Sequence, residues 1–134
     1  MGAWGSGSFQ NDDASDWIAD FGDDPDESLI VDALSAVVEM NDYLEAPDCS
    51  VAIAAAEIVA ALKGSPNPAM PEEVRESMGI LGMDADRDKV VLALKALERI
   101  KTDSELKELW DDAANPAEWY GAISDLETRL ASVH

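Results

Sequence analysis

The segment that most constrains the fold is VAIAAAEIVAALK, residues 51–63, which is apolar on nearly every side. A helix with apolar residues all round is normally buried, so other helices have to cover it. Its alanines allow those neighbours to approach closely. The run is interrupted by Glu57 and is too short to span a bilayer. We therefore expect a central, buried helix over residues 50–63.

Helical periodicity continues on both sides of this segment. Apolar residues recur at intervals of three and four, and breakers of Gly, Pro and Asn separate the runs. No stretch alternates in the way a half-buried β-strand does. The expected helices cover residues 12–21, 26–44, 50–63, a short one from 71, 86–101, 102–112, and one from 116. We therefore predict an all-α fold, a compact single-domain bundle (residues 1–134) of about six or seven helices, preceded by a Gly/aromatic loop, MGAWGSGSFQ.

The charge of the chain excludes two classes of partner. The 134 residues include 29 Asp and Glu against 9 Lys and Arg, a net charge of −20. Affinity for nucleic acid comes from neutralising phosphates with Lys and Arg, and anionic membranes also attract basic segments. We therefore expect no nucleic-acid and no membrane partner. Residues 1–70 contain 14 acids and one base, so the first half is the more negative.

Single cysteine and histidine residues limit the chemistry. Cys49 has no second cysteine with which to form an internal disulfide. His134 is the only histidine, which removes most histidine-based catalysis and any multi-histidine metal site. A signal peptide begins with basic residues and an apolar run, and residues 1–10 contain neither. We expect a cytoplasmic protein with no catalytic residue that can be named and no cofactor.

The candidate binding residues are six aspartates in and after the first expected helix: Asp12, Asp13, Asp16, Asp20, Asp23 and Asp24. Three of them, Asp12, Asp16 and Asp20, share a helix face at a spacing of four. Carboxylates this close repel, so a basic partner or a hard cation such as Mg²⁺ or Ca²⁺ could compensate them. An acidic face screened by solvent and salt is the third interpretation.

Three functional hypotheses follow from these observations. The first is an acidic protein-binding module that meets a basic protein, as an immunity protein, an antitoxin or a nucleic-acid mimic does. The second is a helical domain whose acidity serves only solubility. The third is an Mg²⁺- or Ca²⁺-dependent enzyme with the N-terminal aspartates as ligands. The sequence ranks the binding module first and the enzyme last, and it leaves the oligomeric state open.

The N-terminus also carries a resemblance. Residues 1–9, MGAWGSGSF, followed by NDDA at 11–14 and Trp17, resemble the opening signature of the domain of unknown function 4259 family. The stretch SELKELW, residues 104–110, and the later Trp119 are similar to the ending of that family. The resemblance covers essentially the whole chain. It implies a small, stand-alone, bacterial cytosolic protein and carries no activity over to this chain.

Overall fold

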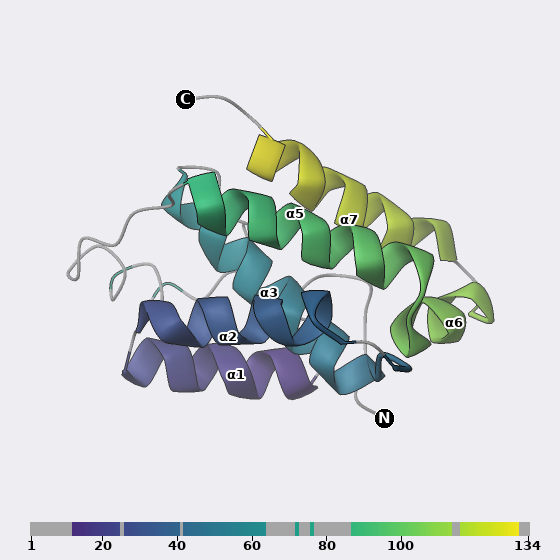
Figure 1. Ribbon diagram of the computed structural model, residues 1–134, viewed down its shortest axis with the longest axis horizontal. Helices are drawn as coiled ribbons and strands as arrows, with labels where there is room; N and C mark the ends of the chain where they lie inside the picture. The colour runs from purple at the N-terminus through teal and green to yellow at the C-terminus, as the bar shows by residue number, and fades with distance from the viewer. Residues whose placement is uncertain are drawn as a thin grey trace.

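A computed structural model describes residues 12–24, 26–40, 42–63, 72, 76, 87–113 and 116–131. Within those ranges the chain forms six α-helices and no β-strand (Figure 1), which confirms the all-α prediction: α1 (Asp12–Asp23), α2 (Glu27–Val38), α3 (Ala46–Leu62), α5 (Arg87–Thr102), α6 (Glu105–Asp111) and α7 (Pro116–Ala131). None of these six is long and apolar enough to cross a membrane. The expected N-terminal loop and most of the short helix expected from residue 71 lie outside the described residues.

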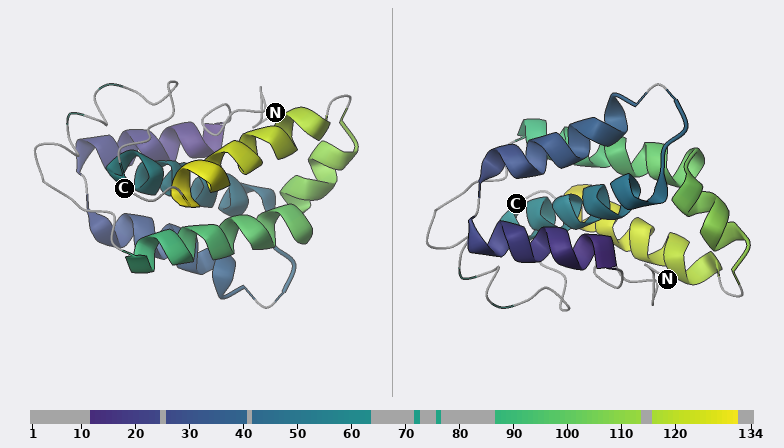
Figure 2. Two further views of the ribbon diagram at one scale, coloured as in Figure 1. Left: turned by 90° about the horizontal axis from the view of Figure 1, so that it is seen from above. Right: turned by 90° about the horizontal axis from the view of Figure 1, so that it is seen from below.

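The helix α3 lies at the centre of the bundle, as the sequence predicts. It packs against α1, α2, α5, α6 and α7, and Figure 2 shows it between the other helices in two views. Eleven of its residues are buried, from Cys49 to Ala60 with the exception of Val51. Most of those side chains are small, so the backbones of the surrounding helices can come close to its axis.

The helices α1 and α2 pack on different sides of α3. The buried stripe of α1 consists of Ala14, Ile18 and Phe21, spaced three and four residues apart. The half-buried ring of Trp17 stacks on Phe21 with the ring centroids 5.5 Å apart. The helix α2 begins after Asp26, whose carboxylate accepts a hydrogen bond from the Ser28 amide at 2.9 Å.

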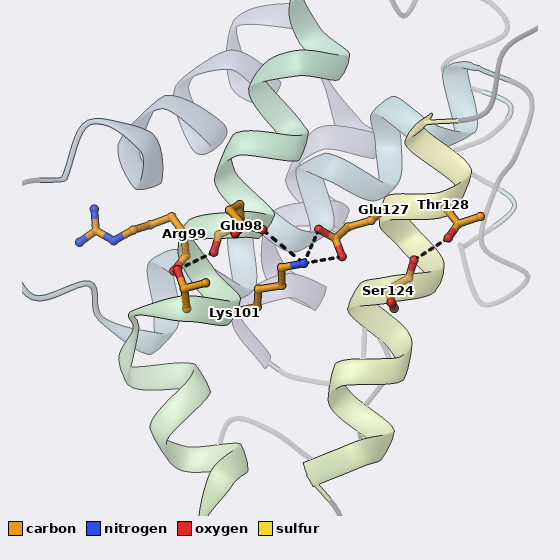
Figure 3. A network of polar contacts seen from close by, with 7 residues as sticks. Glu98, Arg99, Lys101, Ser124, Glu127 and Thr128 are labelled. Atoms are coloured by element: carbon orange, nitrogen blue, oxygen red, sulfur yellow. Dashed lines mark hydrogen bonds and ion pairs between the residues drawn. The ribbon is translucent and has the colours of Figure 1, made fainter.

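The helix α5 packs against α2, α3 and α7. A polar link adds to the apolar contact between α5 and α7 (Figure 3). The Lys101 ammonium lies 2.9 Å from one Glu127 oxygen, and 3.3 Å from a Glu98 oxygen one turn back along α5. Hydrogen bonding to Glu127 is the largest cause that raises the pKa of Lys101.

One predicted boundary is wrong: the helix expected over residues 26–44 ends at Val38. Leu44 is buried, as its place in the pattern suggested, but it lies in the connection between α2 and α3. Ala46 and Pro47, expected to end the preceding helix, instead begin α3. Proline is well accommodated in a first helical turn because its missing N–H has no partner there. Glu105 pins this junction, since its carboxylate accepts from the Ala46 amide at 2.8 Å.

A second boundary is displaced by two residues. The pattern Thr-Asp-Ser-Glu predicts a helix start at residue 102, but Thr102 is the last residue of α5. Ser104 is the cap of α6: its hydroxyl accepts from the Lys107 amide at 3.1 Å and donates to the Ile100 carbonyl at 2.6 Å. Thr102 and Ser104 are both residues that cap helices well. Buried Ser104 is the cap because its hydroxyl hydrogen-bonds to both α5 and α6.

Candidate functional site

The six candidate aspartates lie in α1 or directly after it. Asp12 is in the first turn, and its side chain is outside the described residues. The other five have exposed side chains at spacings of three and four along the helix: Asp13, Asp16, Asp20, Asp23 and Asp24. They lie away from the stripe formed by Ala14, Ile18 and Phe21, which α1 buries against α3. We call these five residues the α1 carboxylates.

The basic residues of the chain are used elsewhere. No Lys or Arg occurs in α1 or α2. Of the eight Lys and Arg side chains in the described ranges, six make hydrogen bonds or ion pairs within the bundle: Lys63, Lys89, Arg99, Lys101, Lys107 and Arg129. In the part of the chain that the structure describes, none of these reaches an α1 carboxylate, so no described base neutralises the negative charge on α1.

This arrangement costs stability. Like charges at a spacing of three or four on a helix destabilise it by about 0.2–0.5 kcal/mol per pair. Asp23 and Asp24 are also at the C-terminal end of α1, where the helix dipole disfavours negative charge. The last turn of α1 contains no basic residue to offset them. Asp13, in the first turn, is favoured by the helix dipole, but Asp16, Asp20, Asp23 and Asp24 are not explained by the folding of this helix.

The structure does not support a metal ion at these residues. Among the described residues, no group of three or more Asp, Glu, Cys or His side chains is arranged to hold one. A hard cation such as Mg²⁺ or Ca²⁺ needs several oxygen ligands on one point, whereas these carboxylates spread along an exposed helix. The hypothesis of a magnesium or calcium enzyme thus has no supporting observation in the described part of α1.

An open cleft of about 320 Å³ lies between α2 and α5. It is lined by Glu27, Ser28, Val31, Asp88, Lys89 and Leu92. Lys89 is buried, and its ammonium forms an ion pair with the carboxylate of Glu27. Glu27 belongs to α2 and Lys89 to α5, so this ion pair joins the two helices. Sequence reasoning did not identify it, because residues 27 and 89 are brought together only by packing.

A second ion pair, whose carboxylate is fully buried, joins α3 to α7. Glu57 is fully buried, and its two oxygens accept from the Arg129 guanidinium at 2.7 and 3.1 Å. Arg129 also donates to Asp125 at 2.9 Å. Burial lowers the pKa of Arg129, but its bonds to Glu57 and Asp125 outweigh burial and raise it. The sequence showed Glu57 only as an interruption of the apolar run.

The cysteine is part of the core and is not poised as a nucleophile. Cys49 is fully buried near the start of α3. Burial raises its pKa to about 11, although a hydrogen bond with Ser104 acts in the opposite direction. The thiol is therefore protonated at neutral pH, whereas nucleophilic chemistry requires the thiolate.

The end of the bundle near α6 presents an aromatic residue held by a carboxylate. Tyr43, in the connection between α2 and α3, is 52% exposed, and its hydroxyl donates to Glu108 of α6 at 2.5 Å. This hydrogen bond is the largest cause that raises the pKa of Tyr43 to about 12. The nearby charges of Glu105 and Asp103 raise it further. Sequence reasoning missed this residue because it placed Tyr43 inside a helix.

The family assignment rests on most of the chain. The family described as a domain of unknown function, DUF4259, matches residues 2–122. No curated protein and no solved structure matches the chain. The match covers α1 to α6 completely and ends within α7, at residue 122. The chain therefore belongs to the DUF4259 family.

Proposed function

We propose that this protein is an acidic binding module whose partner is a basic protein. The observation that supports this proposal best is the set of α1 carboxylates, which are exposed and without a described ion pair. Four of them, Asp16, Asp20, Asp23 and Asp24, are also unfavourable for the helix that carries them. Residues that cost stability without a structural return are commonly retained for function. Complementary charge would give fast association and choice of partner, as in immunity proteins, antitoxins and nucleic-acid mimics.

The distribution of charge within the bundle is consistent with this function. Lys101 of α5 and Arg129 of α7 pair with the carboxylates of Glu98, Asp125 and Glu127 on the same two helices. Among the described residues, no base compensates α1 in this way. A basic partner that approaches from solution therefore meets an unneutralised field at α1, and a partner with many Lys and Arg residues, such as a nuclease, is the class that it favours.

The test compares two variants with the same change in charge. The first replaces four of the α1 carboxylates, D16N, D20N, D23N and D24N. The control replaces four exposed carboxylates elsewhere, D32N, E39Q, D48N and E118Q, for which no ion pair is found among the described residues. Each is immobilised beside the wild type and used to capture proteins at low salt from a lysate of the organism that encodes the chain. Captured proteins are eluted with a salt gradient and identified by mass spectrometry.

We expect one basic protein to bind stoichiometrically to the wild type and to the control variant. The α1 variant should release it at lower salt, and with purified partner its association rate constant should fall about tenfold or more. The proposal is wrong if no basic protein is retained. It is also wrong if the two variants elute the partner at the same salt concentration.

A further inference from the structure

The end of the bundle formed by the α2–α3 connection and α6 combines exposed apolar side chains with a dense ring of carboxylates. Leu109 is 58% exposed and Tyr43 is 52% exposed, the two largest fractions among the large hydrophobic side chains of the described residues. Leu109 directly follows Glu108, the residue that holds the Tyr43 hydroxyl. Figures 1 and 2 both place the connection and α6 at the same end of the bundle. We call residues 42–45 together with 103–112 the end patch.

The end patch is rigidly connected to the core. The Glu105 amide donates to the carbonyl of Leu44 at 2.9 Å, and the Glu105 side chain accepts from Ala46 at 2.8 Å. Arg99 donates to the carbonyls of Met40 and Asp42 at 2.7 and 3.1 Å, which holds the connection from the α5 side. Since the backbone on both sides of Tyr43 is fixed, its ring is presented in one orientation before any partner arrives.

The charge of the end patch is strongly one-sided. It contains one base, Lys107, which forms an ion pair with Asp111 at 2.5 Å. Its seven carboxylates belong to Asp42, Glu45, Asp103, Glu105, Glu108, Asp111 and Asp112. Arg99, which reaches the patch from α5, offsets one further negative charge. An exposed aromatic face surrounded by carboxylates favours an ammonium or guanidinium group, because both the ring quadrupole and the acids attract it.

We propose that the end patch is the docking site for a Lys/Arg-rich segment of a partner protein. In this arrangement one basic side chain stacks its charged head on the Tyr43 ring, and its aliphatic part packs on Leu109. The rim carboxylates, among them Glu105 and Glu108, receive the neighbouring basic residues. This inference rests on the proposed function, and it names the place where binding is anchored.

Two other occupants are disfavoured by charge. A second copy of this chain would bring another −20 to the same surface. An anionic membrane would be repelled by the same carboxylates. The α1 carboxylates differ from the end patch because no large apolar side chain of α1 is exposed among the described residues. Charge alone steers a partner toward a surface, whereas aromatic and apolar anchors carry most of the affinity.

The test maps binding of a defined cationic probe on the full-length protein. The probe is an acetylated and amidated octapeptide in which Gly alternates with Arg or Lys. It is titrated into ¹⁵N-labelled protein at low salt, and amide chemical-shift changes are recorded. The variants are Y43A and L109S, with V91S as the matched control, because Val91 is an exposed apolar residue near the opposite end of α5. Thermal melting is measured for each variant. The L109S substitution alters an exposed side chain that is not part of the hydrophobic core.

We expect the largest shift changes in the end patch. Y43A and L109S should each weaken binding about fivefold or more, which is the effect of truncating an anchor residue. V91S should leave the affinity unchanged. Shift changes confined to α1, with L109S binding as the wild type does, would overturn the docking site and leave the acidic binding module standing.

Two further outcomes decide the inference. Absence of peptide binding at low salt overturns both the docking site and the acidic binding module. The second outcome comes from analytical ultracentrifugation of the protein without peptide. If the protein is a dimer and L109S abolishes the dimer, the end patch serves self-association and the proposal is overturned.

Discussion

At the scale of single residues, Tyr43 shows how a tertiary contact changes the chemistry of an exposed group. Its ring is half in solvent, and the hydrogen bond to Glu108 raises its pKa more than burial does. The hydrogen bond to Glu108 favours the protonated phenol, because only the neutral form donates to that carboxylate. The charges of Glu105 and Asp103 oppose a second anion beside them. The hydroxyl therefore stays a donor well above neutral pH.

This predicts a late ionisation of Tyr43. In a Y120F background Tyr43 is the remaining tyrosine, and its ultraviolet tyrosinate absorbance should rise near pH 12, well above the ordinary value of 10. Adding E108Q should move the midpoint toward 10, because the amide carries no charge. The folded-state pKa is the higher one, so the contribution of Tyr43 to stability is complete below pH 10 and is lost between 10 and about 12. An unchanged midpoint in E108Q would show that Glu108 is not the cause.

At the scale of elements, helices far apart in sequence are joined by charged pairs in an apolar bundle. Glu57 is in the middle of α3, where every other nearby side chain is apolar, and Arg129 of α7 satisfies both of its oxygens. Lys101 and Glu127 link α5 to α7 in a more exposed position. A buried pair is costly to break because one charge then remains in the core without a partner.

We predict that R129M lowers the free energy of unfolding by about 3–5 kcal/mol, because it leaves the Glu57 carboxylate buried without its partner. The double variant E57L/R129M should recover most of that loss, since neither charge is then present. Urea denaturation of both variants and of E57L measures these differences. If the double variant is as unstable as the sum of the single variants, the two residues do not act as a pair.

At the scale of the whole molecule, net charge and its placement affect stability independently of the core. The apolar side chains of the other five described helices surround α3, while the excess of carboxylates lies on the surface. Exposed charges within about 10 Å of one another still interact at 0.1 M salt. The α1 carboxylates have no described base to oppose them, so their repulsion should be visible in the folding equilibrium.

We therefore predict that the variant D16N/D20N/D23N/D24N is more stable than the wild type at low salt by about 1 kcal/mol, from the sum of several like-charge pairs. Asn and Asp have similar helix propensities, so the change is mainly electrostatic. Its melting temperature should also rise less with NaCl than that of the wild type. The control D32N/E39Q/D48N/E118Q removes the same charge but loses acids that favour the first turns of α3 and α7. Equal stabilisation of both variants would mean that net charge, rather than its placement on α1, is responsible.

Much of the element structure could be read from residue spacing. The stripe of Ala14, Ile18 and Phe21 indicated α1, and the nearly all-apolar run of residues 51–63 predicted a central helix. Boundaries were less certain where two signals compete. Leu44 continued the helical period of α2 but is buried from a connection, and Pro47, a frequent terminator, begins a helix. An apolar side chain can be buried from a helix or from a connection, so its position in the period does not tell which of the two carries it.

The sequence by itself determined that this protein is helical, that α3 is central and that the first half is strongly acidic, because spacing and charge are properties of neighbouring residues. The tertiary structure decided which charges are neutralised. Arg129 finds Glu57 across 72 positions, and Tyr43 finds Glu108 across 65. Such partners depend on the packing of whole helices, which no local pattern encodes. For the same reason, only the fold shows that six of the eight described bases are used inside the bundle, and that the α1 carboxylates and the exposed side chains of the end patch face the solvent.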